Sequence, residues 1–230
     1  MNPAKSARAV TIGETVGPQV YRILREQIIH AELLPGERLS ESDVAKALSV
    51  SRQPVREAFI KLSEEGLVHV LPQRGTFVTK ISVASVMDVR FVREAIEADV
   101  VRAVAEVHAP ETIEELRRQI VEQRKVPQQD RAAFLRLDEL FHRTLAAAAG
   151  NAYAWSVIES VKAQMDRVRF LSVDDMHVGR LIDQHEQIVD GIAAGDKAAA
   201  EKATRLHLRE ILSSLPEIAR SRSELFDGTE

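Results

Sequence analysis

Apolar residues recur at intervals of three and four along most of this chain, which is the spacing of one face of an α-helix. Before residue 82 the pattern predicts a helix over residues 18–31, a short second helix after Ser40 and a third helix starting near Arg52. Two short apolar stretches, 67–71 and 76–81, predict strands joined by a turn at residues 72–75. Beyond residue 82 the helical spacing continues, which predicts an antiparallel all-helical bundle.

The predicted helices of this second region are separated by prolines and glycines. One long helix starts at Val83 and ends before Pro110, the next ends before Pro127, and a third covers residues 130–149 up to Gly150. Single helices are then predicted through Trp155–Val168, through Leu181–Ile192 and through Ala200–Ile211. The expected organisation is a flexible arm at 1–17, a small domain at 18–81, a helical domain at 82–220 and a tail at 221–230.

The third predicted helix has one apolar face and one face of forked hydrogen-bond donors. Ser51 suits the N-cap, and Pro54 falls in the first turn, where its missing N–H is harmless. The apolar face consists of Val55, Phe59 and Leu62, and the donors are Arg52, Gln53 and Arg56. Arginine can pair bidentately with guanine and glutamine with adenine, so the polar face suits a DNA groove. The alternative is an ordinary amphipathic helix with a solvated basic side.

The neighbouring elements favour DNA binding. Ser40 stands three residues before Asp43, the pattern of a capping box, so a second helix precedes a turn at 49–51 and the third helix. The hairpin that follows carries Arg74 and Gly75 at its tip, where a residue without a side chain can approach a groove closely. Taken alone, Arg74 could be a solvated turn residue. Together these elements predict an N-terminal winged helix-turn-helix.

Three motifs in this region resemble the winged helix of the GntR family of bacterial transcription regulators. They are PGERLSE, SRQPVREA and RGTFV, in the family's order across about 50 residues. The resemblance implies DNA contacts by Arg38, Ser51, Arg52, Arg56, Arg74 and Gly75. Gln53 stands where the family more often has Thr, so the base preference there is open.

Composition and charge exclude several kinds of site and several classes of protein. The chain has 230 residues and no cysteine, which excludes disulfides, thiolate zinc sites and cysteine nucleophiles. Residues 1–80 carry a net charge of +2 and the remainder −6, so the basic footprint is local. No apolar run is long enough for a membrane span, and residues 1–15 lack the apolar core of a signal peptide. We expect a cytoplasmic protein with no membrane partner.

Four residues of the helical region could share a metal ion. Asp138 and His142 are one turn apart on one predicted helix, while His185 and His207 lie in the apolar stripes of two others. His185 precedes the turn at Gly195-Asp196 by about as many residues as His207 follows it, so both return to the same height. These donors suit a divalent transition metal, zinc first, with manganese, nickel or iron as alternatives. Each histidine alone could instead be a hydrogen-bonded core residue.

The same positions resemble the effector domain, called FCD, of the FadR-like subfamily of these regulators. DELFHRTL matches its D-x-x-x-H motif, Arg93 and Glu97 match its R-x-x-x-E motif, and Asn151 follows the glycine as in that subfamily. The resemblance implies a bound metal and a small carboxylate effector, with Asn151 among the effector-binding residues. Arg93 is the first candidate to hold the effector, with Arg169 and Arg167 as lesser candidates, although all three could instead form ion pairs.

We therefore expect a regulator that binds DNA in a sequence-specific manner, not an enzyme. A homodimer would place two winged helices on a palindromic operator, and a small organic acid effector at the metal would modulate binding. Two alternatives stay open. One is a metal-dependent hydrolase on a helical bundle, although no HExxH motif is present. The other is a regulator with a metal-free effector pocket.

Overall fold

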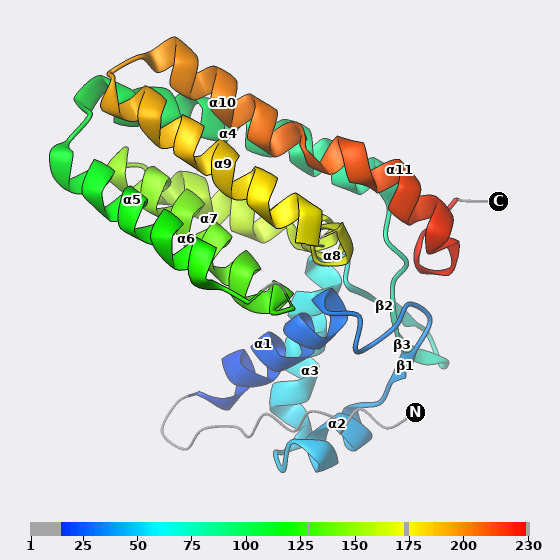
Figure 1. Cartoon of the computed structure of the whole chain (residues 1–230). Helices are drawn as coiled ribbons and strands as arrows, with labels where there is room; N and C mark the ends of the chain where they lie inside the picture. The colour runs from blue at the N-terminus through cyan, green and yellow to red at the C-terminus, as the bar shows by residue number, and fades with distance from the viewer. Residues whose placement is uncertain (1–14, 128, 173–174, 229–230) are drawn as a thin grey trace. The chain divides into compact units, whose positions relative to one another are not determined.

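The computed structural model describes residues 15–127, 129–172 and 175–228, and these form two units (Figure 1). The first unit contains the residues up to Val83 together with those from Ala219 onward, and the second contains Ala84–Ile218. Residues 1–14, most of the arm expected at 1–17, lie outside the described residues. Helices dominate and one small antiparallel sheet follows the N-terminal helices, so the predicted fold class is confirmed. Among the described residues, no helix combines the length and the apolar character that a bilayer crossing requires.

In the first unit, the described residues before Val83 form helices and a three-stranded sheet. Its elements in chain order are α1 (Val16–Ile29), β1 (Arg38–Leu39), α2 (Glu41–Ala47), α3 (Arg52–Glu64), β2 (Val68–Leu71) and β3 (Gly75–Val78). The sheet order is β1-β3-β2 with antiparallel pairs throughout, and Arg38 pairs with Phe77. Strand β1 was not predicted because a strand of two residues is too short to show an alternation of apolar and polar side chains.

Helix α3 begins at Arg52, as its sequence predicts, and Val55, Phe59 and Leu62 are buried. Helix α2 is capped by Ser40, whose side chain accepts a hydrogen bond from the Asp43 amide. Ser49 takes a left-handed φ of 56° in the turn between the two helices. These features fix the start of α3 and so the direction of its exposed side chains.

The second unit is a helical bundle. Its elements are α4 (Val83–Val107), α5 (Pro110–Lys125), α6 (Arg131–Ala148), α7 (Ala152–Val161), α8 (Ala163–Ser172), α9 (Asp175–Ala193), α10 (Lys197–Arg209) and α11 (Ile211–Ser221). Helices α9 and α10 run side by side after the turn at Gly195, and α5 lies along α9 (Figure 1). A Cβ built at Gly191 would lie 2.7 Å from the Ala200 backbone nitrogen, so glycine permits this close packing.

Two helices predicted as single are interrupted. The helix through Trp155 and Val168 divides at Lys162, whose ψ of −3° departs from the about −42° of a regular α-helix. The last predicted helix divides at Glu210, whose amide bonds the His207 carbonyl three residues back in a local 3₁₀ turn. Apolar spacing alone carries no signal for either break, because the spacing continues across it.

The C-terminal residues belong to the first unit. Residues Ser223–Leu225 form a 3₁₀ turn, and Phe226 is buried. Ile81 donates its backbone amide to the Leu225 carbonyl at 2.9 Å and accepts from Asp227 at 3.0 Å. This part of the chain, expected as a tail, adds a parallel bridge between Ile81 and Phe226.

Candidate metal centre and DNA-contacting face

Three helices bring four buried donor groups together in the second unit. Asp138 and His142 come from α6, His185 from α9 and His207 from α10, and none is more than 5% exposed. Their ligand atoms all lie within 4.8 Å of one another. That spread is near the roughly 4 Å that separates opposite ligands of one metal ion. The rings of His185 and His207 are 4.5 Å apart, so the prediction that they face each other is confirmed.

Glutamine side chains fix the proton position on two of the imidazoles. Gln123 donates its amide N–H to the Leu137 carbonyl, so its oxygen faces His185 Nδ1 at 2.8 Å. Gln184 donates its amide N–H to Glu210, so its oxygen faces His207 Nδ1 at 3.2 Å. An amide oxygen can only accept, and therefore both histidines carry their proton on Nδ1.

The third imidazole has the same orientation for a different reason. His142 Nδ1 lies 2.5 Å from an oxygen of the Glu97 carboxylate, a short contact that favours a proton on Nδ1 although its angle is not that of a hydrogen bond. Glu97 in turn accepts from Arg93 Nε at 2.7 Å. All three imidazoles thus turn the lone pair of Nε2 toward the centre of the cluster, as metal-binding histidines do when outer partners hold Nδ1–H.

Several acceptor atoms meet at the centre of the cluster. His142 Nε2 and His207 Nε2 are 3.1 Å apart, and with the protons of both rings on Nδ1 the two atoms face each other as acceptors. His185 Nε2 is 3.5 Å from Asp138 Oδ1, and among the described residues neither atom has a hydrogen-bond partner. Buried acceptors facing one another are unfavourable unless a cation lies between them. The donor set and the unpartnered atoms therefore fit a divalent transition metal.

The protonation states at neutral pH also suit a cation. Burial alone would raise the pKa of Asp138, but the Arg169 guanidinium and the three imidazoles hold that pKa well below its usual value. Burial lowers the pKa of His185 to about 3. Burial and the adjacent imidazoles lower the pKa of His207 well below its usual value. The carboxylate is therefore ionised and these two imidazoles are neutral, the forms that bind metal.

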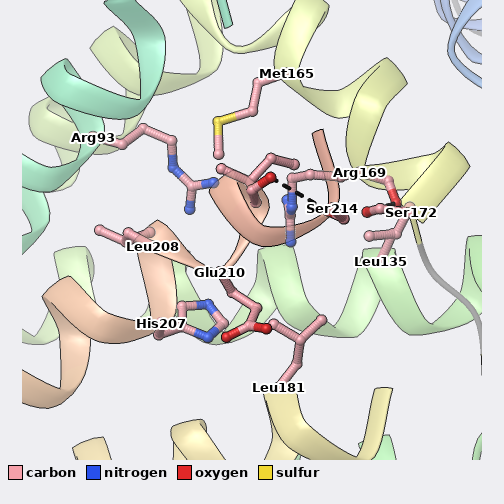
Figure 2. A pocket seen from close by; sticks show the side chains of 11 residues that line it. Arg93, Leu135, Met165, Arg169, Ser172, Leu181, His207, Leu208, Glu210 and Ser214 are labelled. Carbon is pink, nitrogen blue, oxygen red and sulfur yellow. Dashed lines mark hydrogen bonds between the residues drawn. The ribbon is translucent and has the colours of Figure 1, made fainter. Parts of the chain in front are cut away.

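A pocket that is partly open to solvent borders this cluster at His207 (Figure 2). Its walls are mainly apolar, including Leu135, Met165 and Leu181. Arg93 and Arg169 direct their guanidinium groups into it from facing sides, with Glu210 and His207 beneath them in this view (Figure 2). The pocket can hold a small molecule that has an apolar part and an anionic group.

The predicted effector residues differ in their placement. Arg93 is 2% exposed, and among the described residues its Nη2 has no hydrogen-bond partner although its Nε bonds Glu97. Arg169 lines the same pocket and pairs with the metal-ligand candidate Asp138. Arg167 is buried beside Gln164, and Asn151 is exposed at the start of α7; neither lines this pocket.

The predicted DNA-contacting residues lie on the first unit. Arg52, Gln53 and Arg56 are exposed along one face of α3, while Arg38 and Arg74 are exposed on the sheet and its hairpin. Gly75 has a φ of 111°, and an added Cβ would lie 2.8 Å from Arg38 Nε, so Arg38 covers this glycine. Gln53 donates to Glu57 at 3.1 Å. Ser51 occupies the N-cap position of α3 but its side chain makes no capping hydrogen bond, which corrects the predicted cap.

The residues that hold the outer sides of the three imidazoles were not predicted from the sequence. Gln123 interrupts the apolar stripe of α5 after Leu116 and Ile120, and a buried amide in such a stripe signals a specific partner. Gln184 directly precedes His185, and its partner Glu210 lies on a different segment. Glu97 was noted only beside Arg93, whereas the structure also places it on His142.

Comparisons with known proteins agree over nearly the whole chain. Residues 17–78 match the model for bacterial regulatory proteins of the gntR family, and residues 88–210 match the FCD domain. The chain is 41% identical over 217 residues to the HTH-type transcriptional repressor RspR of Escherichia coli strain K12, covering 93% of this chain and 94% of that protein.

Solved structures share the fold. A putative GntR transcriptional regulator from Rhodococcus sp. RHA1 has a TM-score of 0.70 and 28% identity, covering 87% of this chain and 97% of that one. McbR/YncC of E. coli has a TM-score of 0.73 and 19% identity, covering 89% of this chain and 98% of that one. At 19% identity, the similarity to McbR/YncC shows a shared fold alone.

Proposed function

This chain belongs to the GntR family of bacterial transcription regulators and carries an FCD domain, and from this premise we propose that a metal-bound carboxylate controls its binding to DNA. The family and the relatives are DNA-binding regulators, so the alternative of a metal-dependent hydrolase does not stand.

The proposed metal ligands are Asp138, His142, His185 and His207, with zinc first and manganese, nickel or iron as alternatives. The observation that carries this proposal is the convergence of three imidazole lone pairs and one carboxylate, with Nδ1 of each imidazole occupied by an outer partner. A bound ion would supply a Lewis acid that accepts oxygen atoms of a chelating anion.

The proposed effector is a small organic acid in the pocket beside His207. Arg93 supports this because its buried Nη2 is unpartnered among the described residues and because it lines a pocket that also has apolar side chains. We assign Arg169 a supporting role, since its guanidinium already pairs with Asp138. Asn151, the third residue proposed to bind the effector, does not line this pocket. A contact between Asn151 and an effector in this pocket would require a displacement of α7.

The proposed DNA contacts are Arg38, Ser51, Arg52, Gln53, Arg56, Arg74 and Gly75. We propose a cytoplasmic homodimer that sets two winged helices on a palindromic operator. Because RspR is named as a repressor, we propose that this chain represses as well. The effector must bind the DNA-competent and the DNA-incompetent arrangements with different affinity, because equal affinity leaves the equilibrium between the two arrangements unchanged.

The proposal is tested by measuring DNA affinity with and without metal and acid. A duplex is first selected from a random pool of 30-base-pair DNA by the purified full chain. Its dissociation constant is then measured for chelator-treated protein, for protein with zinc, and for protein with zinc and citrate or lactate. We expect the acid to change the affinity only when zinc is present. An equal response to the acid without zinc would favour the regulator with a metal-free pocket.

A further inference from the structure

An acidic side chain lies among the arginines proposed to contact DNA. Glu41 is the first residue of α2, where the cap at Ser40 fixes the backbone. Its carboxylate bonds Arg56 through Nε and Nη2, each at 3.1 Å, and Arg52 through Nη2 at 3.1 Å. One carboxylate therefore joins the two halves of the helix-turn-helix through both arginines.

The two arginines are held differently. The Nε and Nη2 edge of Arg56 is occupied by a two-bond contact, which fixes the plane of its guanidinium. Arg52 gives Glu41 one bond and keeps Nε and Nη1 free of that contact. Arg52 thus keeps four of its five N–H donors and Arg56 keeps three, so Arg52 is the freer of the two to make the two bonds that a bidentate contact with guanine needs.

The contribution of Glu41 to folding stability does not explain why an acidic residue stands at this position. The side chains of Arg52 and Arg56 are 64% and 57% exposed, and ion pairs this exposed add little to folding. A negative charge on a surface that faces phosphates also opposes DNA binding. The two guanidinium groups lower the pKa of Glu41, Arg56 first, so the carboxylate keeps its charge near neutral pH.

We infer that Glu41 is a specificity-determining residue of this DNA-contacting face: it positions Arg52 and Arg56 and weakens binding to DNA that cannot engage Arg52. On the correct sequence, Glu41 holds Arg52 and Arg56 in place for a base edge, and this gain exceeds its repulsion of the phosphates. On other sequences the same repulsion acts without that gain, so the ratio of the two affinities rises. This inference rests on the proposed contacts of Arg52 and Arg56 with DNA.

The test compares Glu41→Gln with wild type in the full chain. The probes are the duplex selected by the wild-type chain and the same duplex with its sequence scrambled. We expect Glu41→Gln to bind the scrambled duplex more tightly and to lower the affinity ratio about tenfold, the scale of one base contact. Glu41→Asp keeps the charge but shortens the reach, so it should lower the ratio without tightening binding to the scrambled duplex.

Glu64→Gln is the matched control. Glu64 is an exposed acid in the last turn of α3, twelve residues and about 18 Å along the helix from Arg52. The same charge is removed beyond the screening length of about 10 Å at moderate salt. We expect this variant to keep the wild-type ratio.

The outcomes separate the inference from the proposed function. A wild-type ratio in Glu41→Gln, with a lowered ratio in Arg52→Ala, would overturn the role of Glu41 and leave the DNA contacts in place. A wild-type ratio in both variants would overturn the proposed contact of Arg52 together with the inference. Equal loss in Glu41→Gln and Glu64→Gln would also overturn it, because a general charge effect would then suffice.

Discussion

Replacing Gln123 by Leu should weaken metal binding although Gln123 is not a proposed ligand. Gln123 is 1% exposed, accepts from His185 Nδ1 at 2.8 Å and donates to the Leu137 carbonyl at 3.2 Å. Leucine has a similar volume but cannot accept, so the imidazole of His185 loses both its fixed tautomer and its orientation. The loss of such an outer partner lowers metal affinity about 10- to 100-fold, or about 1.4–2.7 kcal/mol.

The variant should also lose folding stability, because two buried polar groups lose their partner. Each unpaired group costs about 1–3 kcal/mol. Gln119→Leu provides the matched control: Gln119 lies one turn earlier on α5, is 2% exposed and bonds Glu115 and Thr144 instead of a histidine. It should lose stability in the same range without losing metal affinity.

The assay is a zinc titration against a chromophoric chelator, paired with urea denaturation of both variants without metal. We expect the two variants to differ in zinc affinity by at least tenfold at similar stability. Equal zinc affinity in Gln123→Leu and Gln119→Leu would refute the assignment of the His185 tautomer and of its role.

Three further predictions concern other parts of the two units. Arg52→Ala should weaken binding to the selected duplex by about 1–3 kcal/mol and flatten the sequence preference, measured against the scrambled duplex; an unchanged preference would contradict the docking of α3. Gly191→Ala should destabilise the chain by about 1–3 kcal/mol in urea denaturation, because its Cβ would meet the Ala200 backbone; wild-type stability would show that α9 and α10 adjust freely. Arg93→Met should abolish the effect of citrate or lactate on DNA affinity while zinc content stays at the wild-type level; a retained effect would exclude Arg93 as the effector contact.

The helices and the inward-facing histidines could be predicted because the spacing of apolar residues along the sequence shows which side of each helix is buried. Arg52 begins its helix as the placement of Pro54 in the first turn predicts, and His185 meets His207 because the turn at Gly195 divides the two helices evenly. Burial on a helix depends on residues three and four apart, and the printed sequence contains that information directly.

Contacts between distant segments could not be predicted in this way. The pairing of Gln184 with Glu210, and of Glu41 with Arg56, depends on how two helices cross. The interruptions at Lys162 and Glu210 depend on backbone angles that apolar spacing does not record. The outer residues that determine the three tautomers are therefore structural findings, and they give the metal proposal its strongest support.

The most direct test of the central claim is the metal content of the purified chain by elemental analysis. The wild-type protein should contain about one zinc or similar divalent ion per chain, and His142→Ala, His185→Ala and His207→Ala should each lose it. The same metal content in all three variants as in the wild type would contradict the claim that these imidazoles bind a common ion.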